Sequence, residues 1–380
     1  MSFNNTTLNK TSSKMFLPVH GGALNAAAEF FNIPNEQWLD ISTGINPTSW
    51  PVPEVPSRVW QRLPEEQKGS GESLEQTALG HYLNNTKLKT NDNTQTESPV
   101  TRDNVLSCAG SQQGIRLLPF LYAASQHGRK TEAKVWVTSG SYAEHGIAWE
   151  EQGHRVCKVA CDKISELLSQ QPVDVLILLN PDNPSGHRWP AEQLLKWWSI
   201  LHRRGGWLIV DEAFMDMTPE HSIAGSVERE GLFVLRSLGK FFGLAGLRLG
   251  FVLAAEKNIK RLNKMLGPWV VSHPAQYLGK LALQDEAWVN KQRYELAQQS
   301  LRLASLLEQH IRCQCDGTDL FQTVYHKKSE SLFNQLAQQG ILVRFLPETS
   351  KTSTGLRFGL PSNDEKSWLR LDEALSQLVL

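Results

Sequence analysis

Four short segments of the sequence carry polar side chains that could serve one ligand. Each segment follows or ends a run of apolar residues, and they are AGSQQG at 109–114, NPDNPSG at 180–186, VDEAF around Asp211, and RSLGKFFGLAGLRLG at 236–250. The first can offer free backbone N–H groups to a phosphate where a helix begins, and the second can offer amide donors. A buried carboxylate at Asp211 would need a cation or a hydrogen-bonding partner. The four segments together fit the parts of a single cofactor site.

Lys240 is the chemical centre of the fourth segment, because its neighbours are small or apolar and supply little countercharge. A lysine that loses hydration has a lowered pKa, and its neutral amine is a good nucleophile toward an aldehyde. Ser237 and Arg248, on either side of it, suit a phosphate. The simpler alternative is a lysine at the end of a strand that reaches solvent. The complete set favours pyridoxal phosphate (PLP), a pyridine ring that carries an aldehyde and a phosphate arm.

The elements that must position these residues alternate along the chain. Apolar runs predict strands, and stretches with helical spacing separate them. The predicted strands are 104–111, 133–142, 173–181, 207–214 and 231–239, and the predicted helices include 112–126 and 190–205. This alternation predicts an α/β fold with a mostly parallel sheet covered on both faces, in which ligands bind at the carboxyl ends of the strands.

The pattern changes from about Gly267 onward. A long helical stretch at 274–310 is followed by short strands at 340–346 and 355–361, which predicts a smaller α+β domain at the C-terminus. We therefore divide the chain as follows. The predicted parts are a disordered leader at 1–15, an N-terminal arm at 16–50, a large PLP-binding domain at 51–266 with a polar insertion at 84–104, and a helix with the small domain at 267–380.

The composition narrows the range of partners. The chain has 380 residues, and its 39 basic side chains balance 39 acidic ones, so no overall field attracts nucleic acid or an acidic membrane surface. The polar N-terminus lacks the apolar core of a signal peptide, and no apolar run approaches the roughly 20 residues that span a bilayer. Five cysteines, without the spacing of a zinc site, favour a reducing compartment. We therefore predict a cytoplasmic protein with no metal.

Several motifs resemble those of the fold-type I PLP enzymes, the aspartate aminotransferase superfamily, from roughly Leu17 to the C-terminus. These are LPVHGGALNAAAEF, LDISTGINP, VDEAFMDMTPEHSIAG and RSLGKFFGLAGLRLG. Within the superfamily they look most like the threonine-phosphate decarboxylase family of cobalamin biosynthesis, and the next most similar family is histidinol-phosphate aminotransferase. The resemblance implies a homodimeric PLP-dependent carbon–carbon lyase. Its substrate would be a small phosphorylated amino acid, L-threonine O-3-phosphate, and its products (R)-1-amino-2-propanol O-2-phosphate and CO2.

The resemblance also assigns roles to individual residues. Lys240 would bond covalently to the cofactor aldehyde, and Asp211 would pair with the ring nitrogen. The other implied cofactor contacts are Asn183 on the phenolic oxygen, Tyr142 on the ring face, and Gly110, Ser111, Ser237 and Arg248 on the phosphate. The implied substrate contacts are His20, Gly21, Gly22, Asn46, Arg344 and Arg357, in which Arg357 grips the α-carboxylate while His20 and Arg344 offer cations to the substrate phosphate.

Two positions depart from the patterns of related aminotransferases. Phe214 stands where many of these enzymes have a tyrosine, so one hydrogen bond to the phenolic oxygen of the cofactor is missing. Leu63 stands where histidinol-phosphate aminotransferases have a tyrosine that reaches the cofactor phosphate of the neighbouring subunit. The first departure is expected to retune the cofactor, and the second removes an expected contact between subunits.

The reaction itself is less constrained than the cofactor, because PLP can activate any of three bonds at the substrate Cα and the protein chooses among them by orientation. The segment His20–Gly22 and the phenylalanine at 214 favour decarboxylation. One alternative is an aminotransferase acting on histidinol phosphate or a related amino acid. Another is a PLP-binding regulator without catalysis, against which the intact Lys240 and Asp211 argue.

Overall fold

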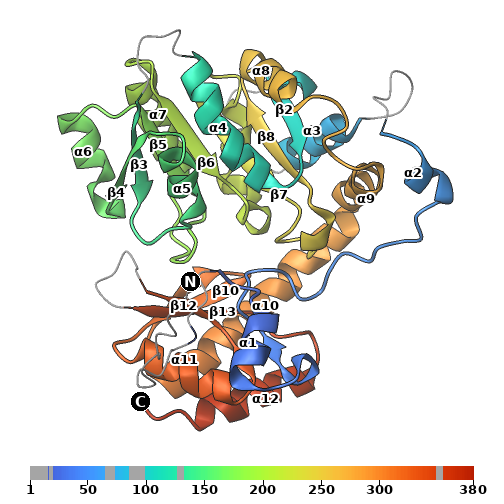
Figure 1. Ribbon diagram of the computed structural model, residues 1–380, viewed down its shortest axis with the longest axis vertical. Helices are drawn as coiled ribbons and strands as arrows, with labels where there is room; N and C mark the ends of the chain where they lie inside the picture. Colours follow the sequence, from blue (N-terminus) through green and yellow to red (C-terminus); the bar gives the residue numbers. More distant parts are fainter. Residues whose placement is uncertain (1–15, 17–19, 65–72, 85–98, 126–131, 348–353) are drawn as a thin grey trace, which may run out of the picture.

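The computed structural model describes residues 16, 20–64, 73–84, 99–125, 132–347 and 354–380. A seven-stranded sheet forms the large lobe at the top of Figure 1, and a four-stranded sheet lies in the small lobe below it. The strands of the large sheet, in spatial order, are β2 (Val105–Cys108), β8 (Gly250–Ala254), β7 (Leu232–Ser237), β6 (Trp207–Asp211), β5 (Val175–Leu179), β3 (Lys134–Thr138) and β4 (Arg155–Val159).

The central strands β5, β6 and β7 of the large sheet are buried along their whole length because helices cover both faces. In β5, Val175 and Ile177 join one core cluster while Leu176 and Leu178 join the other, as the two-residue period of a strand requires. The helices α4 (Ser111–Ser125), α5 (Glu144–Glu150) and α8 (Glu256–Leu266) cover the first face. The second face is covered by α3 (Leu74–Asn84), α6 (Ile164–Gln170), α7 (Ala191–His202) and α9 (His273–Gln284), and α2 (Ser57–Gln61) packs on α9.

The small lobe is built from both ends of the chain. Its antiparallel sheet has the order β12 (Arg344–Leu346), β13 (Gly355–Gly359), β10 (Phe321–Tyr325) and β9 (Cys315–Thr318). Near the N-terminus, β1 (Leu39–Asp40) pairs in parallel with β11 (Ile341–Leu342). The helices of this lobe are α1 (Leu24–Phe31), α11 (Ser329–Gln338), α12 (Glu365–Ser376) and the long α10 (Glu286–Ile311), which runs between the lobes (Figure 1). Residues 39–40 are therefore held beside residues three hundred positions later.

The predicted fold class is confirmed, with three differences of detail. The strands β4 and β8 were not expected from the sequence, and β8 runs antiparallel to both of its neighbours, so the sheet is mixed at one edge. The long helical stretch is two helices that meet at Asp285, whose carboxylate accepts from Trp288 N at 3.0 Å and caps α10. The same carboxylate accepts from Trp50 Nε1 at 3.0 Å, which fixes the break.

Two predicted segments fall largely outside the described residues, namely the leader at 1–15 and most of the polar insertion at 84–104. The predicted domain boundaries stay predictions. None of the helices in the described ranges combines the length and the apolar character needed to cross a membrane.

Candidate cofactor and substrate site

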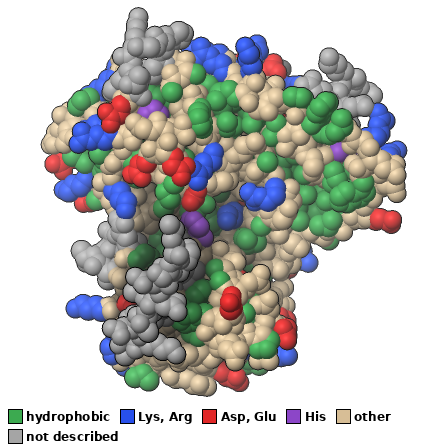
Figure 2. Space-filling view, in the orientation of Figure 1, with side chains coloured by type: hydrophobic (Ala, Val, Ile, Leu, Met, Phe, Trp, Pro, Cys, Tyr) green, Lys and Arg blue, Asp and Glu red, His purple; other side chains and the backbone are tan. Residues whose placement is uncertain are grey.

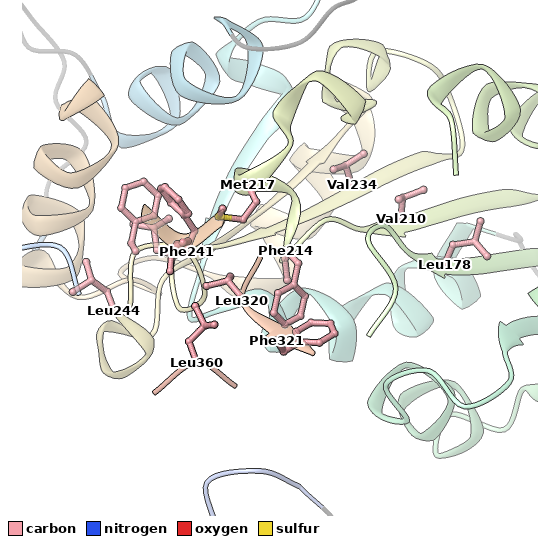
Figure 3. Packing of buried hydrophobic residues seen from close by; sticks show 14 of the residues in the cluster. Leu178, Val210, Phe214, Met217, Val234, Phe241, Leu244, Leu320, Phe321 and Leu360 are labelled. Carbon is pink, nitrogen blue, oxygen red and sulfur yellow. The ribbon is translucent and has the colours of Figure 1, made fainter. Parts of the chain in front are cut away.

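The predicted site residues come together at the carboxyl ends of β5, β6 and β7, on the side of the large sheet that faces the small lobe. Asn183 follows β5, Asp211 ends β6, and Ser237 ends β7 just before Lys240. Figure 3 shows Phe214, in the loop after β6, beside Phe321 of β10, with ring centroids 5.2 Å apart. In Figure 2, histidine and basic side chains gather at the waist between the lobes. The site is therefore made by both lobes.

Lys240 lies where an amine can be neutral near physiological pH. Its Nζ is 5.5 Å from the centroid of the Phe214 ring, and its backbone oxygen accepts from Asn46 N at 3.0 Å. Burial lowers the pKa of Lys240 to about 8; the nearby cation of Arg357 adds to this effect and Asp211 opposes it. The direction is the one expected from the apolar sequence around the lysine.

Asp211 is a buried carboxylate, with 5% of its surface exposed, and its two oxygens have different partners. Oδ1 accepts from Ala213 N at 3.0 Å, and Oδ2 lies 2.9 Å from Nε2 of His145 on α5. A carboxylate held in this way suits a protonated ring nitrogen. His145 was not predicted from the sequence, in which its one signal is its position three residues after Tyr142 at the start of a helix.

The predicted phosphate cradle has the tight geometry that such a site needs. Gly110 has φ +76°, and a Cβ atom there would lie 2.7 Å from a guanidinium nitrogen of Arg248. A Cβ at Gly250 would lie 2.4 Å from the backbone nitrogen of Ser111, the first residue of the 15-residue helix α4. The Ser237 hydroxyl accepts from Gly239 N at 3.2 Å. The small residues thus allow a helix N-terminus, a serine and an arginine to approach one point, which fits a phosphate.

Arg344 and Arg357 approach the site from the small lobe as direct partners in the β12–β13 ladder. Arg357 is buried, donates to Ser42 O at 2.8 Å and to Asn183 Oδ1, and lies over the Phe321 ring. Burial, with the repulsion of Arg344, lowers the pKa of Arg357 to about 9, and burial also lowers the pKa of Arg344.

Neither guanidinium contacts a carboxylate within the part of the chain that the structure describes. Arg344 has a buried nitrogen, NH1, and Arg357 a buried Nε, that find no hydrogen-bond partner there. Buried cations are costly without an anion. The pair therefore has the character of a site prepared for anionic ligands.

Tyr142 and the N-terminal segment close another side of the site. The Tyr142 hydroxyl donates to Gln112 Oε1 at 3.3 Å, and its ring centroid is 6.1 Å from that of His20. Burial, together with Glu144, raises the pKa of Tyr142 to about 12. Gly22 N donates to Ser42 Oγ at 2.7 Å. A Cβ atom at Gly21 would lie 2.3 Å from the backbone oxygen of Ser42, which is too close. These two glycines allow the segment to pass close to the loop that supports Arg357.

Asn46 has a different position from the other predicted substrate contacts. Its Nδ2 donates to Phe241 O at 2.7 Å, and its Oδ1 accepts from Thr48 N at 2.8 Å. Both polar groups of the side chain thus bind backbone groups, one of them in the residue after Lys240, and substrate contact by Asn46 stays a prediction. A buried ionic cluster behind the site, centred on Arg236, also went unnoticed in the sequence, although Glu212 and Arg236 are the immediate neighbours of Asp211 and Ser237.

The chain belongs to the class I and II aminotransferase family, whose model matches residues 36–375. The predicted superfamily resemblance is thereby confirmed. Within that family it is 40% identical to a threonine-phosphate decarboxylase of Pseudomonas aeruginosa, over 94% of this chain and 96% of that protein. It is 34% identical to a threonine-phosphate decarboxylase of a Sinorhizobium species, over 95% of this chain and 98% of that protein.

A solved structure has the same fold at lower sequence identity. It is the histidinol-phosphate aminotransferase from Sinorhizobium meliloti in complex with pyridoxal-5'-phosphate, with a TM-score of 0.66 and 19% identity, covering 80% of each chain. At this identity the likeness concerns the fold alone.

Proposed function

We propose that the protein is a PLP-dependent threonine-phosphate decarboxylase, a lyase that converts L-threonine O-3-phosphate to (R)-1-amino-2-propanol O-2-phosphate and CO2 for cobalamin biosynthesis. The observation that carries this proposal is a pair of arginines near Lys240, the buried Arg357 and the half-buried Arg344, neither of which has a carboxylate partner in the described chain. Two cations suit a substrate with two anionic groups, a carboxylate and a phosphate. The similarity to two threonine-phosphate decarboxylases supports the same conclusion.

The large lobe would hold the cofactor. Asp211, supported by His145, would pair with the ring nitrogen, and Tyr142 and Asn183 would contact the ring. Gly110, Ser111, Ser237 and Arg248 would hold the phosphate. When it is bound, PLP accepts the electrons of a bond that breaks at the substrate Cα.

The small lobe and the N-terminal segment would orient the substrate. Arg357 would grip the α-carboxylate, and Arg344 with His20 would bind the phosphate. Phe214 and Phe321 pack against each other beside Arg357 and Lys240, where they would keep water away from the reacting carbon. The Lys240 amine, with its pKa of about 8, can hold and return a proton at Cα.

The test is an assay of CO2 release from L-threonine O-3-phosphate as the sole substrate of the PLP-loaded enzyme. We expect stoichiometric CO2 and aminopropanol phosphate without any keto acid, and loss of both products in Lys240→Ala. Parallel reactions contain histidinol phosphate with and without 2-oxoglutarate. Turnover that requires 2-oxoglutarate would identify an aminotransferase and overturn the proposal.

We also propose that the enzyme is a homodimer that works in the cytoplasm. Trp60 and Leu63, in and after α2, and Trp269, before α9, are each more than half exposed in the single chain. Large apolar side chains grouped in this way are typical of a surface that a second subunit covers. Light scattering should give twice the chain mass of 42.7 kDa. The cytoplasmic location expected from the sequence stays a prediction.

A further inference from the structure

Glu144 occupies a central position in the site although it has no role in the functions assigned above. It is the first residue of α5, and 13% of its side chain is exposed. Its Oε1 lies 3.2 Å from His20 Nε2, while its Oε2 accepts from Gln112 Nε2 at 2.8 Å and from Arg116 NH2 at 3.1 Å. The Glu144 carboxylate thus contacts three side chains that come from two distant parts of the sequence.

The contact with His20 joins the two lobes. On one side, the segment that follows His20 is tied to Ser42 by the 2.7 Å bond from Gly22 N, and Ser42 O accepts from Arg357 of the small lobe. On the other side, Glu144 belongs to α5 of the large lobe. The contact between His20 and Glu144 therefore links the segment beside Arg357 to the large lobe.

The charges around His20 define what it can bind. Among the described residues, Glu144 is the acidic group that contacts His20. Arg116 contacts the other oxygen of Glu144 and also pairs with Glu151. The Tyr142 hydroxyl donates to Gln112. With Nε2 donating to Glu144, the imidazole has Nδ1 left to donate to a ligand. A ring that donates from both nitrogens is a cation, placed between one carboxylate and one anion of the ligand.

We infer that Glu144 is a positioning residue for the substrate phosphate, which acts by holding the imidazole ring of His20 in place beside Tyr142. This inference rests on the proposed function for the identity of the substrate. A ring that is fixed before binding costs less free energy to order when the phosphate binds. Glu144 therefore strengthens phosphate binding although it is itself an anion.

The experiment is a double-mutant cycle with His20→Asn, Glu144→Gln and the two together, measured in the PLP-loaded enzyme. Inorganic phosphate, titrated calorimetrically, is the probe, because it reports binding without turnover. We expect Glu144→Gln to weaken phosphate binding about tenfold, equivalent to about 1.4 kcal/mol. The double variant should match His20→Asn alone, because Glu144 acts through His20. In kinetics with L-threonine O-3-phosphate, KM should rise by a similar factor while kcat stays within about twofold.

Glu150→Gln is the matched control, since Glu150 is exposed on the same helix and its replacement removes the same charge. Additive effects in the cycle, unchanged phosphate affinity, or tighter binding by Glu144→Gln would overturn the inference; tighter binding would show that the carboxylate competes with phosphate for His20. If the wild-type enzyme does not decarboxylate threonine phosphate, the proposed function fails, while the phosphate titrations still decide the role of Glu144.

Discussion

Two groups of arginines that are buried or half-buried lie within this protein, and they differ in how their charge is balanced. Behind the site, Arg236 donates to Glu212 Oε2 at 2.9 Å and to Asp216 Oδ1 at 2.7 Å, with all three side chains about 1% exposed or less. In front of it, Arg344 and Arg357 have no carboxylate within the described residues. Burial alone would lower the pKa of Arg236, but Asp216 and Glu212 raise it above its ordinary value. The pKa of Arg357 falls to about 9.

The cluster around Arg236 connects elements rather than binding a ligand. Its guanidinium lies 4.3 Å from the centroid of the Tyr82 ring of α3, and Asp216 also contacts His81 of the same helix at 3.3 Å. Arg293 of α10 donates to the backbone oxygen of Asp216 at 2.8 Å. Because successive strand residues point to opposite faces, Arg236 anchors the back of the strand whose next residue, Ser237, faces the cofactor site.

The presence or absence of carboxylate partners distinguishes an arginine that stabilises the fold from one that is available to bind a ligand. A buried cation surrounded by carboxylates holds the protein together, and its removal leaves those carboxylates uncompensated. A buried cation without a carboxylate partner lowers the stability of the ligand-free protein, and an anionic ligand can compensate its charge. The same substitution, arginine to methionine, should therefore affect mainly stability in the first group and mainly activity in the second.

The largest effect is expected for Arg236→Met. Loss of this cation leaves Glu212 and Asp216 buried without their main partner, which should lower the free energy of unfolding by about 3–5 kcal/mol. Urea denaturation of the wild type and the variant, followed by tryptophan fluorescence, measures the change. A loss below about 1 kcal/mol would mean that the cluster has no structural role.

Arg357→Met tests the other half of the comparison. The variant should lose about 100-fold in kcat/KM for threonine phosphate, because a charge-assisted contact with the α-carboxylate is worth about 1.5–3 kcal/mol. Its free energy of unfolding should fall by only about 1–2 kcal/mol, since no buried carboxylate loses its partner and only the neutral acceptors Ser42 O and Asn183 Oδ1 lose a donor. A destabilisation as large as that of Arg236→Met would show that Arg357 is a structural residue, and the comparison would fail.

The part of the site that belongs to the large sheet was predictable from the sequence. Asp211, Ser237 and Lys240 each follow a short apolar run, and parallel strands bring their carboxyl ends to one edge. The antiparallel β8 was missed because GFVLA directly follows the glycine-rich segment after Lys240, which hides where the strand begins. The strand β4 was missed because RVCKV is largely half-buried or exposed and lacks a clear apolar pattern.

The contacts between lobes were not predictable from local pattern. Arg357 came from family resemblance, and its pairing with Asn183 joins residues 174 positions apart. The roles of His145 and Glu144 depend on how α5 is placed relative to Asp211 and His20, which no local spacing in the sequence encodes. The Arg236 cluster likewise required the placement of α3 and α10 against the loop after β6.

The smallest effect concerns Lys240, whose charge is balanced only in part, by Asp211. Its pKa of about 8 in the folded protein lies below the ordinary 10.5, so between these pH values the unfolded chain binds more protons than the folded one. Stability therefore rises with pH in this range, and for the cofactor-free protein we expect a gain of about 1 kcal/mol from pH 7 to pH 9. Urea denaturation between pH 7 and pH 9 measures this gain.

In Lys240→Met the gain in stability should vanish, whereas Lys196→Met, which removes an exposed lysine of α7, should retain it. Parallel curves for the wild type and Lys240→Met would mean that the amine is hydrated and that its pKa is not lowered. In that event the neutral nucleophile would have to be produced by the cofactor rather than by the fold.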